Sequence, residues 1–304
     1  MAEQLDLLLE YPHDLPLRDL GSFVTNMTKR LPFVEPNVDP FGLFVPLEIW
    51  CDKQNILPNA RIPRFDFSLQ VVGRKRRHIG TPNDSARMIH KLFQGWLQKA
   101  CLAHEKLRRF LVPESATAFT PGSSPLKNVA THLSSQYFYI VDLKDAYSSI
   151  DTDLIALILT AIIRYDDYQE DFNDFLWQAS FSGHNKNTLE KAGRDPLYLR
   201  MQKFVDTFCR DTNGRGLITG GPVSPFLFNL FYEAVLDSAL RRICAKLSRK
   251  VRYTRYADDL VFSRTTQPIF LTIRTEIRNA IATSGIVNHR KSRVLDRRNG
   301  VVFI

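Results

Sequence analysis

Two adjacent aspartates, Asp258 and Asp259, interrupt a segment that otherwise has the composition of a buried β-hairpin. Residues 251–257 and 260–262 are rich in aromatic and β-branched side chains, which favour two short strands joined at the acidic pair. Aspartate is unfavourable inside a strand and costly to bury alone, so the pair needs a turn, a cation or a metal ion. A solvated hairpin tip is the simplest interpretation of the pair by itself. A metal site requires another carboxylate elsewhere in the chain.

A third aspartate, Asp142, follows the run 137–141, whose aromatic and β-branched residues predict a strand. We expect this strand to end at Asp142 and the chain to turn toward the helical stretch 151–165. Beside a hairpin carrying Asp258 and Asp259, Asp142 would complete a cluster of hard oxygen ligands that suits Mg²⁺. Such a cluster can hold two ions roughly 3.5–4 Å apart, which is the arrangement used in nucleotidyl transfer.

Composition favours a soluble protein with a polyanionic partner. Hydrophobic residues make up 44% and charged residues 24% of the 304 residues, as in a globular protein. Lys and Arg outnumber Asp and Glu by 41 to 32, giving a net charge of +9. The four cysteines lack the spacing of a zinc site or disulfide framework. The amino terminus lacks a signal-peptide pattern, and no apolar run reaches the ~18 residues of a membrane span, so we expect a cytoplasmic protein with no membrane partner.

Three segments in a fixed order carry a family resemblance. They are Asp142 followed five residues later by Tyr147, the glycine-rich segment Gly216-x-x-x-Gly-x-Pro-x-Ser-Pro, and Tyr256-Ala-Asp-Asp. Together they resemble motifs A, B and C of a reverse transcriptase palm, most closely those of bacterial retrons, group II introns and antiphage defence systems. The resemblance runs from about residue 70 to the carboxyl terminus. It implies an α/β (α+β) right-hand polymerase fold with an antiparallel palm sheet and fingers.

The resemblance also assigns roles to individual residues. Asp142, Asp258 and Asp259 correspond to the catalytic aspartates that hold two Mg²⁺ ions, with Mn²⁺ as a substitute. Tyr147 falls where reverse transcriptases keep a bulky aromatic that collides with a 2′-hydroxyl and so favours deoxynucleotides; a core tyrosine is the alternative. Lys75 and Arg77 lie in a basic cluster on an expected fingers hairpin, followed by a helix, and match residues that grip the triphosphate. A solvated basic loop, or contact with phosphate backbone alone, is the alternative there.

The glycine-rich segment departs from the family pattern at one position. Thr219 replaces a glutamine that helps to hold nucleotide and template, and Gly220 follows it. Ser224 and Pro225 are expected to start a long amphipathic helix over residues 226–240. We therefore expect Thr219 and Gly220 to lie at the nucleotide, and we expect Thr219 to alter the use of the template.

Two further segments resemble family motifs that contact nucleic acid or nucleotide. Residues 118–132 contain Gly122, which is expected to turn the chain, and Asn128, which opens a helix face, and both are expected to shape the template groove. Residues 284–295 resemble motif D, in which Lys291 matches a lysine that protonates the leaving pyrophosphate and Asn288 matches the asparagine before it. A surface lysine in a basic loop is the alternative for Lys291.

These assignments predict three regions and one activity. Residues 1–69 would form a leader that packs on the core, 70–135 the fingers, and 136–304 the palm, ending at a primer-grip-like hairpin. No thumb is evident, so the chain is a fragment, or a protein partner, a structured noncoding RNA or a second copy supplies the clamp. The expected activity is RNA-directed DNA polymerisation from dNTPs, an RNA template and a DNA primer, in a retron or antiviral defence system. The alternatives are a template-independent or protein-primed polymerase of the abortive-infection type, and a non-catalytic nucleic-acid-binding subunit with a polymerase fold.

Overall fold

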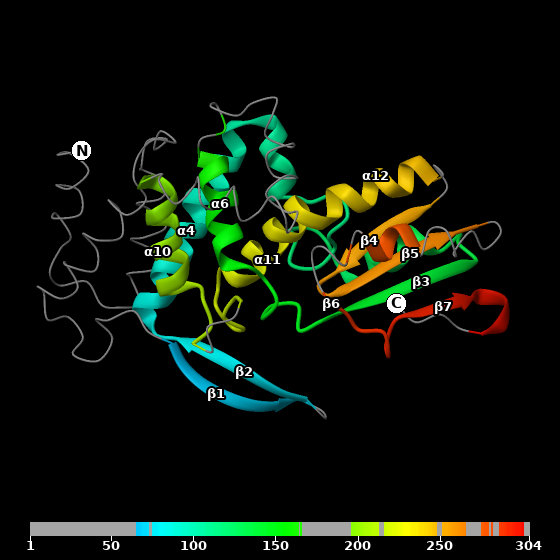
Figure 1. Ribbon diagram of the computed structural model, residues 1–304, viewed down its shortest axis with the longest axis horizontal. Helices are drawn as coiled ribbons and strands as arrows, with labels where there is room; N and C mark the ends of the chain where they lie inside the picture. The colour runs from blue at the N-terminus through cyan, green and yellow to red at the C-terminus, as the bar shows by residue number, and fades with distance from the viewer. Residues whose placement is uncertain are drawn as a thin grey trace, which may run out of the picture.

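The protein is a mixed α/β molecule with antiparallel sheets, which confirms the predicted class (Figure 1). The computed structural model describes residues 65–72, 75–163, 165, 196–212, 216–247, 251–265, 275–279, 281 and 286–300. Residues 1–64, most of the expected leader, lie outside these ranges, as do residues 301–304 of the expected primer-grip hairpin. In the described part of the chain, no helix combines the length and apolar character needed to cross a membrane.

A five-stranded antiparallel sheet carries the acidic residues, and its central strand is β3 (Tyr137–Lys144). One side of β3 pairs with β5 (Asp259–Arg264), which in turn pairs with β4 (Arg252–Tyr256). The other side pairs with the short strand β6 (Ile286–Val287) and with β7 (Arg293–Asp296). Six consecutive residues of β3 are buried, as expected for a strand covered on both faces.

The prediction that β3 ends at Asp142 is wrong by two residues. Leu143 and Lys144 continue the strand because they pair with Val287 and Ile286 of β6. The extra pairing comes from a segment more than 140 positions away in the chain, so local composition could not indicate it. Asp142 therefore lies within a paired strand and has little freedom to move.

Helices pack beside and over the sheet, as Figure 1 shows. The helices α4, α6 and α10 form one group, and α11 and α12 lie nearer the sheet. Nearly every residue of α6 is buried, which makes this helix the centre of the hydrophobic core. The bounds of the helices are α4 Asp84–Ala103, α5 Pro125–His132, α6 Thr152–Ile163, α10 Pro196–Phe208, α11 Ser224–Tyr232 and α12 Ser238–Leu247, with short 3₁₀ helices at Glu105–Phe110 and Arg297–Asn299.

The long helix predicted to begin at Ser224 and Pro225 is present, but it differs from the expectation in two ways. It is buried almost all round over α11 rather than amphipathic, because it lies between the sheet and the helices around α6. It also contains a π-helical turn, Glu233–Asp237, between α11 and α12. Such turns are rare inside helices and are frequent at functional sites.

A separate hairpin made of β1 (Phe65–Val72) and β2 (Lys75–Pro82) confirms the hairpin predicted ahead of α4. Its attachment to the core includes a hydrogen bond from the Gly80 N–H to the carbonyl of Thr219, at 2.8 Å. Gly220 has φ of +100°, and a Cβ there would lie 2.6 Å from the Gly80 carbonyl oxygen. The glycine at position 220 is thus required both by its left-handed backbone and by the close approach of the hairpin.

His132 joins α5 to the sheet from a fully buried position. Its Nδ1 lies 2.6 Å from Ser263 Oγ, and its Nε2 lies 2.6 Å from Thr254 Oγ1. Burial, with a smaller effect of the nearby Arg252 charge, lowers the pKa of His132 from 6.5 to about 4. The folded state therefore holds His132 neutral where an unfolded chain would already bind a proton.

We predict that this histidine makes the fold sensitive to acid. The stability that neutral His132 gives to the fold is fully present above pH 6.5 and is lost as the pH falls toward 4. This loss should lower the free energy of unfolding by up to about 3 kcal/mol. Urea unfolding of the His132→Asn variant should show a shallower loss of stability over this range than the wild type. The control is His289→Asn at an exposed position. Equal slopes for all three proteins would contradict the prediction.

Candidate active site

The three predicted aspartates meet at one end of the β3–β5 pair. Asp142 is directly opposite Asp259 in the antiparallel register. The N–H of Leu143 donates a 2.9 Å hydrogen bond to the carbonyl of Asp258, which lies in the turn between β4 and β5. Ala257, the other turn residue, has φ of +52°, a left-handed conformation that non-glycine residues seldom adopt. The turn thus carries strained backbone next to the acidic pair.

Asp142 is held by the two residues that resemble motif D. Asn288 Nδ2 donates to Asp142 Oδ1 at 2.7 Å, and Lys291 Nζ contacts Oδ2 at 2.6 Å. The backbone N–H of Asn288 also donates to the Asp142 carbonyl, at 2.8 Å. Asp142 is buried, whereas the Lys291 side chain is about half exposed, with a relative accessibility of 47%. The structure therefore brings Asp142 together with two predicted site residues that lie 146 and 149 positions further along the chain.

The acidic end of the sheet carries carboxylates, which are suitable ligands for a divalent ion, but these side chains are not arranged as a metal site. Within the described ranges, no three His, Cys, Asp or Glu side chains are arranged to hold a metal. Both carboxylate oxygens of Asp142 instead face Asn288 and Lys291, so a lysine ammonium balances its charge. Three aspartates on adjoining backbone still supply the hard oxygen donors that Mg²⁺ prefers. A metal ion at Asp142 would have to share the carboxylate with Lys291 or displace it.

Tyr147 lies on the α11 side of the aspartates. Its ring stacks on Phe228, with centroids 4.6 Å apart and planes 24° from parallel. Burial, followed by the negative charge of Asp258, raises the pKa of the Tyr147 hydroxyl well above its ordinary value, so the group stays neutral. The Leu217 N–H donates to the Tyr147 carbonyl at 3.0 Å. Gly216 permits this approach, because it has φ of +62° and a Cβ there would lie 2.1 Å from the same carbonyl oxygen.

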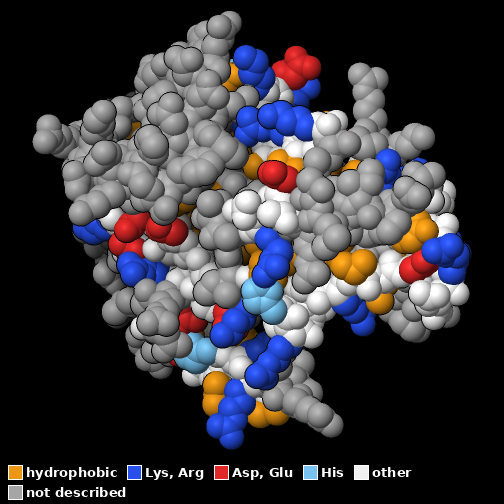
Figure 2. Space-filling view, turned by 45° about the vertical axis from the view of Figure 1, so that its right-hand side comes forward, with side chains coloured by type: hydrophobic (Ala, Val, Ile, Leu, Met, Phe, Trp, Pro, Cys, Tyr) orange, Lys and Arg blue, Asp and Glu red, His pale blue; other side chains and the backbone are white. Residues whose placement is uncertain are grey.

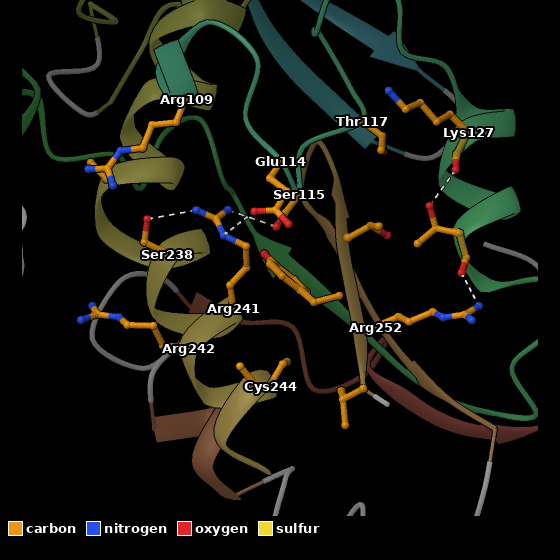
Figure 3. A pocket seen from close by; sticks show the side chains of 16 residues that line it. Arg109, Glu114, Ser115, Thr117, Lys127, Ser238, Arg241, Arg242, Cys244 and Arg252 are labelled. Carbon is orange, nitrogen blue, oxygen red and sulfur yellow. Dashed lines mark hydrogen bonds and ion pairs between the residues drawn. The ribbon is translucent and has the colours of Figure 1, made fainter. Parts of the chain in front are cut away.

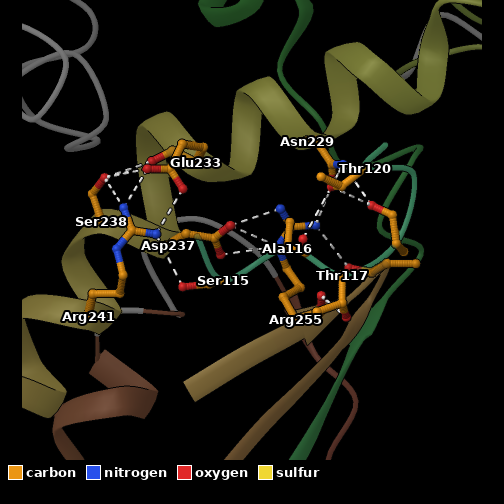
Figure 4. Close-up of polar contacts among 12 residues, drawn as sticks. Ser115, Ala116, Thr117, Thr120, Asn229, Glu233, Asp237, Ser238, Arg241 and Arg255 are labelled. Carbon is orange, nitrogen blue, oxygen red and sulfur yellow. Dashed lines mark hydrogen bonds and ion pairs between the residues drawn. The ribbon is translucent and has the colours of Figure 1, made fainter. Parts of the chain in front are cut away.

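A buried ion pair lies beside the β4–β5 turn, and Figure 4 shows its two members, Arg255 and Asp237, facing each other. Arg255 and Asp237 are both fully buried, and Arg255 Nη2 lies 2.8 Å from Asp237 Oδ2. Arg255 Nη1 also donates to Asn229 Oδ1 at 3.1 Å and to the carbonyl of Ala257 at 3.2 Å. The guanidinium thus connects the π-turn, α11 and the strained turn residue next to Asp258.

The backbone of Arg255 links the same turn to the segment before α5. Its N–H donates to the Ser115 carbonyl at 2.7 Å, and its carbonyl accepts from the Thr117 N–H at 2.8 Å. Its guanidinium carbon also lies 5.1 Å from the ring centre of Tyr232, within cation–π range. Sequence reasoning missed Arg255. The available signal was a charged residue inside a run otherwise typical of a buried strand.

The π-turn brings two buried acids to face two arginines. Glu233 is fully buried, and Arg241 Nη1 donates to its Oε2 at 2.9 Å, while Asp237 faces Arg255 and also accepts from the Tyr253 hydroxyl at 2.6 Å. Burial is the main cause that raises the pKa of Glu233, and the Arg241 hydrogen bond opposes it. An extra residue in the helical turn changes which side chains face the sheet, so the turn helps to aim these acids.

The remaining predicted residues lie in several places. Arg77 is exposed on β2, the backbone of Lys75 begins the same strand, and the Lys75 side chain lies outside the described residues. Gly122 is exposed with φ of +70°, as a turn requires. Asn128 is only 2% exposed, and its Oδ1 accepts from the Thr254 hydroxyl. Its side chain therefore joins α5 to β4 and is not available to a template.

One face of the molecule presents the basic hairpin. Figure 2 shows Lys and Arg side chains spaced along this face as far as the β1–β2 hairpin at the bottom. Arg76 and Arg77, both on β2, are exposed. The hairpin thus offers positive charge to solvent, consistent with the expected contact to phosphate.

Comparisons with known proteins agree with this architecture. Residues 68–301 match the family model described as reverse transcriptase (RNA-dependent DNA polymerase). The retron Ec83 reverse transcriptase of Escherichia coli is 26% identical over 184 residues, covering 59% of this chain and 50% of the relative. The chain therefore spans about half the length of this curated relative.

Two solved telomerase structures share the fold. The telomerase from Candida albicans, in complex with a TWJ fragment of telomeric RNA, has a TM-score of 0.50 at 13% identity and covers 87% of this chain and 49% of its own. The apo telomerase from Candida tropicalis has a TM-score of 0.51 at 11% identity, over 86% of this chain and 50% of its own. At such low identity the similarity concerns the fold alone.

We predict that the buried ion pair is essential to the stability of the site. Replacement of Arg255 by Met leaves Asp237 buried without its main partner, which should lower the free energy of unfolding by about 3–5 kcal/mol. The double variant Arg255→Met with Asp237→Leu should recover a large part of that loss, because neither charge is then buried alone. Urea unfolding of the three proteins measures both effects. A single variant as stable as the wild type would contradict the prediction.

Proposed function

The chain belongs to the reverse transcriptase family, and on that basis we propose that it extends a DNA primer on an RNA template with dNTPs. One observation carries the proposal: Asp142 and Asp259 are paired across adjacent strands, Asp258 lies in the next turn, and the motif D residues contact Asp142. This is an acidic end on a rigid sheet, with a basic hairpin at another edge of the molecule. We further propose that the sheet is the palm and the β1–β2 hairpin with α4 is part of the fingers of a right-hand polymerase.

Asp142, Asp258 and Asp259 are the residues that would hold two Mg²⁺ ions, or Mn²⁺ in their place. When bound, such ions supply positive charge for the attacking primer oxygen and for the pyrophosphate that leaves. The chain's own residues position these groups. Pairing of β3 with β5 fixes the relative position of the three aspartates, and the Arg255 hydrogen bond to the Ala257 carbonyl fixes the turn.

The contact between Lys291 and Asp142 bears on the proposed role of Lys291 as a proton donor. Its ammonium neutralises Asp142 across 2.6 Å, and it is exposed enough to reorient when a cation takes over that charge. Released from Asp142, the same ammonium would be available to donate a proton to the leaving pyrophosphate. We therefore propose that Lys291 alternates between stabilising the acidic end of the sheet and acting as the general acid.

Tyr147 is the residue proposed to select the sugar. Stacking on Phe228 fixes its ring beside Asp258, where the ring would collide with the 2′-hydroxyl of a ribonucleotide. Arg77 and Lys75 are proposed to bind the triphosphate, and the backbone around Thr219 and Gly220 to lie against the nucleotide. The hydrogen bond from Gly80 to the Thr219 carbonyl supports this arrangement, because it ties the triphosphate hairpin to the turn before α11.

The biological setting is proposed from the retron relative alone. That relative makes a retron or antiviral defence role the first setting to test, with a structured noncoding RNA as template or partner. A protein partner or a second copy of the chain is the alternative to an RNA partner. A polymerase that needs no template is separated from the main proposal by its product in reactions without RNA.

We predict that Asp258→Asn abolishes Mg²⁺-dependent primer extension, because it removes one negative charge from the proposed metal ligands. Incorporation of dNTPs on an RNA template should fall by at least about 10³-fold, with the unfolding midpoint little changed. Asp84→Asn, at an exposed position in the first turn of α4, is the control and should retain activity. Undiminished incorporation by the Asp258 variant would refute the assignment. A reaction without template reports on the template-independent alternative.

We predict that Tyr147→Ala relaxes sugar selection. Removing the ring should raise the ratio of ribonucleotide to deoxynucleotide incorporation by about 10-fold or more, whereas Tyr147→Phe keeps the ring and should preserve the ratio. Single-nucleotide extension with matched ribo- and deoxynucleoside triphosphates measures both. Identical ratios in the wild type and the Ala variant would show that Tyr147 is a packing residue only.

A further inference from the structure

We propose that a basic cavity at the edge of the palm sheet, distinct from the acidic end, binds the phosphodiester backbone of nucleic acid. The cavity has a volume of about 810 Å³ and lies between α5, β4 and α12, as Figure 3 shows. This site is independent of the polymerase chemistry proposed above.

The cavity walls carry an excess of positive charge. Five basic side chains line the cavity, against the single acidic residue Glu114: Arg109, Lys127, Arg241, Arg242 and Arg252. Arg241 is largely neutralised, because it contacts buried Glu233 and lies 3.5 Å from Glu114. Among the residues that line the cavity, basic side chains outnumber acidic ones by five to one.

Arg252 lines the cavity, and the hydrogen bonds of its guanidinium group go to neutral acceptors, not to an acidic side chain. Its Nη1 donates to the carbonyl of Thr131 at 2.8 Å and to Ser134 Oγ at 2.6 Å, both neutral acceptors. These bonds fix the guanidinium at the α5 side of the cavity while leaving its charge in place. A planar guanidinium held in one orientation is well suited to bind phosphate oxygens.

Arg109 lies close to the other basic groups of the cavity. Burial is the main cause that lowers the pKa of Arg109; among the nearby charges Glu233 raises it most, while Arg241 and Arg242 lower it. The buried acid Glu233 therefore offsets part of the positive charge at this end of the cavity, and the exposed basic residues at its mouth supply the rest of the attraction for an anion.

The shape and position of the cavity favour a chain of phosphates over a single small anion. Its volume far exceeds that of one phosphate group, and Lys127 and Arg242 lie at exposed positions on different helices, so they can contact successive phosphates. Arg252 begins β4, and Asp258 lies in the turn beyond its other end; the strand from Arg252 to Tyr256 spans roughly 13 Å at about 3.3 Å per residue. Nucleic acid at the cavity would therefore contact the palm well away from the aspartates.

The test measures binding without catalysis. The full chain is titrated in EDTA against a labelled 30-nucleotide single-stranded RNA, and separately against DNA of the same sequence, over a range of KCl concentrations. The variant is Lys127→Glu with Arg242→Glu. At position 127 a glutamate three residues after the Ser124 N-cap completes a capping box, so α5 should be retained. Thermal unfolding checks this, and Lys127→Gln with Arg242→Gln is a second variant that introduces no new charge.

Loss of two phosphate contacts should make the negative slope of log K (the association constant) against log salt shallower by about 1.4, at about 0.7 per contact for single strands. The charge-matched control, Lys203→Glu with Arg278→Glu, changes two exposed positions that do not line the cavity and should lower the slope by less than half as much. The RNA and DNA arms identify which nucleic acid the site prefers.

Equal losses in the cavity and control variants would overturn the proposal, since only overall charge would then matter. Unchanged nucleic-acid binding together with weakened binding of poly-glutamate would also overturn it, in favour of an acidic polypeptide. Because EDTA removes divalent ions, a failure here leaves the polymerase assignment intact. Conversely, an inactive polymerase could still show this binding.

Discussion

The buried ion pair between Arg255 and Asp237 is the interaction on which the acidic end of the sheet depends. A guanidinium and a carboxylate that are both removed from water are stable only when nearly all their hydrogen bonds are made. Asp237 receives hydrogen bonds from Arg255 and from the Tyr253 hydroxyl, and Arg255 also reaches Asn229 and the Ala257 carbonyl. The pair therefore couples the π-turn, α11 and the β4–β5 turn into one unit.

That coupling explains why a strained turn can carry the acidic pair. Ala257 has a left-handed conformation that alanine does not favour, and its carbonyl is held by Arg255. On the other side, the Leu143 N–H holds the Asp258 carbonyl through the β3 backbone. Because the Ala257 and Asp258 carbonyls are both held by hydrogen bonds, the turn keeps the acidic pair in one position at the end of the sheet. A rigid support of this kind is what preorganised charge requires.

The local parts of the site were predictable, and the links between them were not. Runs of aromatic and β-branched residues indicate the β4–β5 hairpin and β3. The resemblance to motif D identifies Asn288 and Lys291, which the structure places against Asp142. Three features escaped prediction because each depends on a distant segment: the extension of β3 by β6, the burial of α11 on all sides, and the placement of Asn128 in the core. The basic cavity likewise combines α5, β4 and α12, which are far apart in the chain.

By itself, the sequence determined which residues carry charge and which short segments become strands, because side-chain pattern and spacing are local properties. Asp142, Asp258 and Asp259 could be assigned to one catalytic site by the resemblance of their motifs to those of reverse transcriptases, since local spacing does not connect them. Only the tertiary structure decided that Lys291 balances Asp142 and that Arg255 supports the turn beside Asp258. The physical reason is that the energy of a charge is set by what lies within a few ångströms of it once water is excluded, and folding alone chooses those neighbours.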